Sequence, residues 1–218
     1  MHEPTFIDEI RRTPIDLPRA TLRFARGIAY PELDVGDYIN RMDQMAETAR
    51  RWLAPAHTHI EQAETLADFL FTHLEFQGNH SEYYDPRNSF LNEVLERRLG
   101  LPISLSVIYL ALAERLAIPA RGIGLPGHFI IGILSEGNPI YLDPFHGGAR
   151  LSEMDCYQLV QQTTGYSDAF QADWLRPVNA EAILTRMLTN LRLLYLQNQD
   201  WSHAQAVVEH LRQLQPQM

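Results

Sequence analysis

The sequence predicts an α+β fold, with helices first, a small antiparallel sheet after them and helices again at the end. Apolar residues recur at helical spacing early in the chain, for example at Val35, Ile39 and Met42. After Ile118-Pro119 this spacing gives way to short apolar runs of extended character, and from Asn179 helical spacing returns. Helices and strands that are grouped rather than alternating are typical of α+β proteins.

The composition is that of an ordinary folded protein. The chain has 218 residues, of which 45% are apolar and 21% charged. The net charge of −9 opposes binding to nucleic acid phosphates or anionic membranes, so we expect neither as a partner. The start MHEPTFIDEI lacks the basic and apolar regions of a secretory signal, and we expect a cytoplasmic protein. The oligomeric state is left open.

Neither a metal site nor a cofactor is expected. The one cysteine, Cys156, excludes an internal disulfide and a multi-thiolate zinc site. The nine histidines form no HExxH motif and no helical i, i+4 pair. The sequence also lacks a Gly-rich strand-to-helix loop that would hold a phosphate.

Helix signals place the elements of the first third. Pro18 suits the first turn of a helix over residues 18–29. Asp34, with Asp37 in capping-box position, predicts the start of a second helix. A third is expected over residues 61–74, where apolar residues again recur at helical spacing.

The middle of the chain predicts a loop, two helices and a hairpin. Residues 77–87, QGNHSEYYDPR, are rich in turn formers. A short helix is expected over residues 89–99, ending at Gly100. Pro102 then fits the first turn of PISLSVIYLALAERL, a helix that is apolar on nearly all sides and should be buried. Two apolar runs that flank Ser-Glu-Gly-Asn, in residues 128–143, predict a β-hairpin.

The remaining elements are expected on either side of this hairpin. Residues 120–125 would add a third strand, and Ser152 with Asp155 forms a capping box for a helix to about residue 162. A loop or short turn to Pro177 and two helices from Asn179 complete the chain.

The hairpin register predicts a contact between His128 and Asp143. With the loop at residues 135–138, Ile130 falls opposite Asp143. Because strand residues alternate between faces, His128 and Ile130 point the same way, and Asp143 lies diagonal to His128 within hydrogen-bonding reach. A carboxylate that orients an imidazole is the second half of a nucleophilic triad.

The order of helix N-terminus, His strand and Asp strand is that of papain-like and transglutaminase-like enzymes. GLPISLSVIYLALAERLAIPAR is similar to the transglutaminase-core stretch in which Gly-x-Cys opens a helix that ends in Gly-Ile-Pro-Ala-Arg. Aligned without gaps, Gly100 takes the place of the family glycine and Pro102 that of the cysteine, whereas His128 and Asp143 fall on the family's His and Asp. The resemblance implies a transglutaminase-like core of the papain-like cysteine-proteinase fold.

A longer stretch resembles one branch of these proteins. FQGNHSEYYDPRNSFLNEVLERRLGLPISLSVIYL, followed by PGHF and YLDPFHGG, looks like the bacterial Sir-B-type family, named for invasion-gene regulation, with a transglutaminase-like core and a tetratricopeptide tail. Related segments also occur in some eukaryotic F-box proteins. The similarity covers nearly the whole chain and implies a bacterial regulator.

Pro102 argues against thiol acyl transfer, because proline has no nucleophilic atom. Ser104 and Ser106 are the nearest replacements, but serine needs stronger activation than cysteine, and Ser104 would reach the place of the thiol only after a shift of register. We expect both hydroxyls to pack or bond the backbone within the helix. Cys156 follows the hairpin instead of preceding it, and we expect a small buried thiol.

The C-terminal residues predict a helix pair of tetratricopeptide type. The unit of about 34 residues fits the end of the chain, although Arg192 stands where a small residue is expected. A single repeat cannot bury its apolar face alone, so the pair should dock on the core or on a partner. We expect a core over residues 1–178 and a pair over 179–218, either a dependent appendage or a cut-short array. The repeat positions are taken by Leu191, Tyr195, Ala204, Val208 and Pro216.

Three functions remain open at this point. We favour a pseudoenzyme whose groove beside His128 and Asp143 binds a peptide or protein segment. The alternatives are a hydrolase or acyl transferase that uses Ser104 or Ser106 with this pair, and a rigid platform on which only the tail binds. Polar groove residues could equally anchor the loop, because Asn and Asp side chains commonly hold turns. The candidate groove residues are Asn79, Tyr84, Asp85, Arg87, Asn88, Asn92, Pro102 and Ser106.

Overall fold

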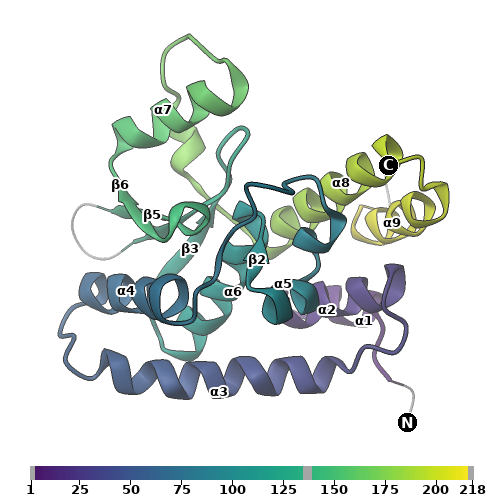
Figure 1. Ribbon diagram of the computed structural model, residues 1–218, viewed down its shortest axis with the longest axis horizontal. Coiled ribbons are helices and arrows are strands. Elements are labelled where there is room, and N and C mark those ends of the chain that lie inside the picture. Colours follow the sequence, from purple (N-terminus) through teal and green to yellow (C-terminus); the bar gives the residue numbers. More distant parts are fainter. Residues whose placement is uncertain (1–2, 135–138, 216–218) are drawn as a thin grey trace.

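The computed structural model describes residues 3–134 and 139–215 and has the predicted α+β architecture (Figure 1). A five-stranded antiparallel sheet has the strand order β6-β5-β4-β3-β7. Helices from the N-terminal part and the C-terminal pair lie beside it. The hairpin loop at residues 135–138 and the repeat position Pro216 lie outside the described residues.

Side-chain caps explain where the N-terminal helices begin. Asp16 accepts from the backbone of Arg19 at the start of α2, and Asp34 accepts from Gly36 and Asp37 at the start of α3. The predicted cap at Asp34 is therefore confirmed. A capping box at Thr58 starts the next helix, slightly earlier than predicted. The elements are α1 (Phe6–Ile10), α2 (Leu17–Ile28), α3 (Val35–Leu53), α4 (His59–Ala67) and the π-helical turn η1 (Asp68–His73).

The helix predicted over residues 89–99 is shorter than expected. It spans α5 (Leu91–Arg97), after the 3₁₀ turn η2 (Pro86–Ser89), and Arg98 ends it in the left-handed conformation with φ 59°. Gly100 is not a helix cap, because it belongs to β2 (Leu99–Gly100), which pairs in parallel with β1 (Gln77–Gly78). This two-stranded sheet ties the polar loop to the start of the next helix.

The central strands of the main sheet are buried on both faces. Alternate residues of β4 (Ile130–Ile133) and β5 (Ile140–Asp143) pack into two different apolar clusters. One cluster includes α6 (Pro102–Arg115), and the other includes Cys156 and Val160 of α7 (Glu153–Thr164). The capping box predicted for α7 at Ser152 is present. The remaining strands and turns are β3 (Ala120–Ile123), η3 (Pro144–His146), β6 (Ala149–Leu151), η4 (Ala172–Leu175) and β7 (Pro177–Val178).

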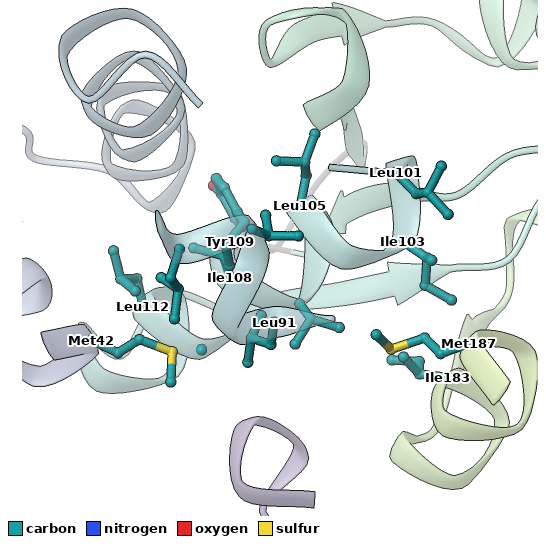
Figure 2. Packing of buried hydrophobic residues seen from close by; sticks show 14 of the residues in the cluster. Met42, Leu91, Leu101, Ile103, Leu105, Ile108, Tyr109, Leu112, Ile183 and Met187 are labelled. Atoms are coloured by element: carbon teal, nitrogen blue, oxygen red, sulfur yellow. The ribbon is translucent and has the colours of Figure 1, made fainter. Parts of the chain in front are cut away.

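Helix α6 is the centre of the main apolar cluster, as its uniformly apolar sequence predicts. Leu105, Val107 and Leu112 are at most 1% exposed. Figure 2 shows Met42 of α3 near Leu112, at one side of this cluster, and Met187 of the C-terminal pair near Ile103 at the start of α6. Helix α6 is therefore held between the N-terminal helices, the sheet and the C-terminal pair.

The C-terminal segment forms the two predicted helices, α8 (Ala180–Gln197) and α9 (Trp201–Leu214). Asn179 caps α8 by accepting from the backbone of Ala182. Buried residues of both helices, such as Leu191 and Leu211, belong to the same apolar cluster as α6. The pair thus docks on the core, whereas its tetratricopeptide character and the boundary after residue 178 stay predictions. No helix in the described ranges is long and apolar enough to cross a bilayer.

Candidate functional site

The side chains of His128 and Asp143 meet in the interior of the protein. The pairing of Ile131 with Leu142 and of Ile133 with Ile140 gives the predicted register. His128 itself lies outside β4, in a turn where its amide donates to the carbonyl of Leu125. The contact therefore arises from this turn and not from alternation along a strand. Nε2 of His128 lies 3.0 and 3.1 Å from the two carboxylate oxygens of Asp143.

Asp143 receives two further hydrogen bonds because Pro144 starts a 3₁₀ turn directly after β5. The amide of Phe145 donates to Oδ1 at 3.0 Å, and Nδ1 of His146 lies 2.7 Å from Oδ2. Burial raises the pKa of Asp143, but the hydrogen bonds and charges of His128 and His146 outweigh burial and leave the pKa below its usual value. The carboxylate is therefore ionised at neutral pH and can only accept hydrogen bonds.

This arrangement leaves the second ring nitrogen of His128 available. Since the Asp143 carboxylate only accepts, Nε2 donates to it, and Nδ1 is the ring nitrogen left free for another partner. Across the described residues, Nδ1 has no hydrogen-bond partner. His128 and Pro102 both line a pocket of about 330 Å³, together with residues of α8. An imidazole held by a carboxylate and facing a helix N-terminus is the geometry of a general base, but residue 102 offers it no proton to remove.

The hydroxyls of Ser104 and Ser106 are engaged elsewhere. Ser104 Oγ donates to the carbonyl of Asn88 at 2.6 Å and accepts from the amide of Leu101 at 2.9 Å. Ser106 Oγ donates to the carbonyl of Pro102 at 2.7 Å, as we expected of a serine inside a helix. Neither serine lines the pocket beside His128. The alternative serine triad is thus not assembled, because both hydroxyls bond the backbone at the start of α6.

Cys156 does not replace the missing nucleophile. It is fully buried in the cluster between the sheet and α7. Burial, together with the charges of Asp155 and Asp143, raises the pKa of the thiol to about 12. A thiol that stays protonated and out of contact with solvent is a packing residue, as its place in the sequence indicated.

Most of the predicted polar groove residues hold the loop before α5. Nδ2 of Asn79 donates to Oδ1 of Asn88 at 3.0 Å, and Nδ2 of Asn88 donates to the carbonyl of Glu82 at 2.7 Å. Asp85 accepts from the amide of Arg87 at 2.9 Å and pairs with its guanidinium. The anchoring interpretation therefore accounts for these four residues.

The other groove predictions have different outcomes. Tyr84 and Pro102 line the pocket beside His128. Asn92 is buried in α5, and its Oδ1 has no hydrogen-bond partner in the described part of the chain. Ser106, as described above, bonds only its own helix.

Several pocket residues were not expected from the sequence. Arg186 of α8 donates to the carbonyl of His128 at 2.8 Å, and α8 also supplies Asn190 and Leu193 to the pocket. No local motif predicts these residues of α8, because they lie about 60 residues along the chain from His128. His146 could have been noticed, since it follows Asp143 at the spacing of a turn.

His128, Asp143 and His146 also form the one described group whose ligand atoms could converge on a metal ion. These atoms lie within 4.8 Å of one another. The sequence spacing predicted no such site. The distances from nitrogen to oxygen, between 2.7 and 3.1 Å, are those of direct hydrogen bonds, which account for the cluster without an ion.

Gly78 allows the turn that carries Asp143 to pack closely on β1. A Cβ at this position would lie 2.5 Å from the ring of Phe145 and 2.6 Å from its carbonyl oxygen. Because the backbone of Phe145 cannot rotate away, we expect Gly78→Ala to destabilise the protein by about 1–3 kcal/mol in urea denaturation. At Gly124 an added Cβ would make only ordinary contacts, so Gly124→Ala should change the stability by less than about 0.5 kcal/mol. Equal effects would contradict this account of the turn.

Comparison with known proteins agrees with the resemblance seen in the sequence. Residues 36–189 match the family model described as Transglutaminase-like superfamily. The UPF0162 protein of Xylella fastidiosa strain 9a5c is 36% identical over 190 residues, which cover 86% of this chain and 68% of that protein. The F-box only protein 21 of Homo sapiens is 33% identical over 130 residues, covering 56% of this chain and 20% of that protein.

The family match extends from α3 into α8 and includes the helix of Pro102 and both residues of the His–Asp pair. No solved structure gave a significant match. The family model and the bacterial relatives together lead to one conclusion: the chain belongs to the transglutaminase-like superfamily and is a relative of the UPF0162 proteins.

Proposed function

We propose that this protein is a non-catalytic member of its superfamily, which binds a peptide or protein segment in the pocket beside His128. The observation that carries the proposal is Pro102, which lines the pocket at the helix N-terminus where the sequence alignment expects a cysteine. Catalysis by acyl transfer needs a nucleophile next to the imidazole. A pyrrolidine ring supplies none, although a pocket is present beside the imidazole.

The shape and lining of the pocket support an extended occupant. Its volume of about 330 Å³ is at the lower end for ligand sites and accommodates a few side chains. At its rim, Tyr84 is 70% exposed and Leu193 is 49% exposed. Exposed tyrosine and leucine next to a cavity continue the apolar surface beyond it, which suits a chain longer than the cavity.

We infer a regulatory role in the cytoplasm from the same features. A protein that binds without chemical change acts by holding or masking its partner. The helix pair α8 and α9 contributes to the pocket and, in this proposal, is a tetratricopeptide-like unit whose outer side contacts the same partner. Partner recognition by a Sir-B-type regulator would use both surfaces.

One experiment tests both parts of the proposal, namely that the protein binds peptides and that it does not catalyse acyl transfer. We expect peptides selected from a displayed random library to bind the wild-type chain, and Leu193→Asp to weaken binding about tenfold or more in fluorescence anisotropy. Leu196→Asp is the matched control, because Leu196 is similarly exposed (40%) on α8 but does not line the pocket. The proposal would be contradicted if selected peptides bound Leu193→Asp and Leu196→Asp equally well. A change in the mass of a peptide on incubation with the protein would also contradict it.

A further inference from the structure

The pocket beside His128 contains a cation from α8. Arg186 lines the pocket, and its Nη2 donates to the backbone carbonyl of His128 at 2.8 Å. Its guanidinium carbon lies 5.6 Å from the ring centroid of Phe129, which is buried. These two contacts fix the guanidinium at the wall of the pocket. A guanidinium has five N–H donors, so one bond to a neutral carbonyl leaves most of them unused.

The charge of Arg186 is not balanced within the described residues. No carboxylate there lies within ion-pair distance of it, whereas the buried Arg23 lies 2.7 Å from Glu3 and 3.8 Å from Glu9. Burial lowers the pKa of Arg186, which reflects the cost of removing its charge from water. Arg186 is partly buried, and charges removed from water are ordinarily paired, so the lack of a carboxylate partner among the described residues indicates that the partner comes from outside.

The rest of the pocket carries no opposing charge. The residues that line it include neither Asp nor Glu, although the chain as a whole has a net charge of −9. Tyr83, Tyr84 and Asn190 supply neutral polar groups, and the other walls are mainly apolar. A pocket that is free of acidic residues and surrounds an unpaired arginine is complementary to a negatively charged group of limited size.

We propose that the pocket recognises an acidic peptide segment, in which an Asp or Glu side chain of the partner pairs with the guanidinium of Arg186. The inference rests on the binding role proposed above and names the chemistry of the occupant. The planar fork of Arg186 takes the carboxylate, and the exposed side chains of Leu193 and Tyr84 contact neighbouring apolar side chains of the segment.

The experiment uses peptides selected from a displayed random library on the full wild-type chain. We expect the selected sequences to share an Asp or Glu, and replacement of that residue by Asn or Gln in the synthetic peptide to weaken binding about ten- to a hundredfold. Arg186→Gln should weaken binding of the acidic peptide by a similar factor and leave the amide peptide almost unchanged. Amidation of the peptide C-terminus should have little effect.

Arg192→Gln is the matched control variant of the protein, because Arg192 lies on the same helix but lines a different pocket. Replacement of the acidic residue in the peptide uses the wild-type protein, so the test stays valid even if Arg186→Gln unfolds the chain. Peptides that depend on Leu193 but contain no required carboxylate, or that bind Arg186→Gln equally well, would overturn this inference and leave the binding role standing. Peptides indifferent to Leu193 would overturn both.

Discussion

A cysteine introduced at position 102 is expected to react with iodoacetamide at pH 7 at least about tenfold faster than an ordinary exposed thiol. In Pro102→Cys the thiol would sit in the first turn of α6, in the pocket that His128 lines. The free Nδ1 of the imidazole can take the thiol proton, and the helix N-terminus stabilises the thiolate. Cys156, with its pKa raised to about 12, contributes little to the measured rate.

The matched control is Ala180→Cys, which places a thiol at the first position of α8, outside the pocket that His128 lines. Mass spectrometry of the intact protein gives both rates, and the dependence on pH reports the pKa of each thiol. The advantage of Pro102→Cys should disappear when His128 is also changed to Gln. Equal rates at the two helix starts would mean that residue 102 does not face the imidazole, and the non-catalytic interpretation would lose its structural basis.

The second large effect is expected for Asp143→Asn, which should destabilise the protein by about 3 kcal/mol at pH 7. The carboxylate accepts from His128, His146 and the amide of Phe145, and both Asp143 and His128 are at most 4% exposed. An amide cannot accept all of these bonds and turns a donor towards one of them. The free energy of unfolding in urea measures the loss.

The Asp143→Asn variant also tests how the stability of the folded protein depends on pH. The pKa of Asp143 is lower in the folded protein than in the unfolded chain, so its contribution is complete above about pH 4, the unfolded value. As the pH falls below this value and through the pKa that Asp143 has in the folded protein, the stabilisation by its carboxylate is lost. The difference between wild type and Asp143→Asn should therefore narrow below about pH 4. Asp173→Asn removes an exposed pair with Arg176 and should change the stability by less than about 0.5 kcal/mol at any pH. A difference that grows in acid would contradict this assignment.

Local signals in the sequence predicted much of the fold. Asp34 and Ser152 cap helices because their side chains satisfy nearby amides, and this chemistry is visible in a few consecutive residues. The hairpin register followed from loop length and pairing. In contrast, β1 and β2 have two residues each and pair in parallel across a long stretch of chain. Strands this short have no recognisable periodicity in the sequence, so they could not be predicted.

The site was predicted only where residues near in sequence or in the family motif define it. His128, Asp143 and Pro102 were found in this way. Arg186 depends on how α8 packs across the pocket, which is decided by the apolar faces of distant helices and not by any motif around residue 186. For Asn79 and Asn88 the sequence left a groove role and loop anchoring open, because it shows their polar groups but not the side-chain and backbone partners that these groups bond.

The hydrogen bonds of Ser104 bear on how this protein could change over evolutionary time. The start of α6 is held by that hydroxyl, by the Asn88 carbonyl and by the Leu101 amide, and none of these bonds involves the side chain of residue 102. A substitution at residue 102 can therefore leave these hydrogen bonds in place. Under the proposed non-catalytic role, a reactive side chain at residue 102 could be lost or regained without disturbing these bonds.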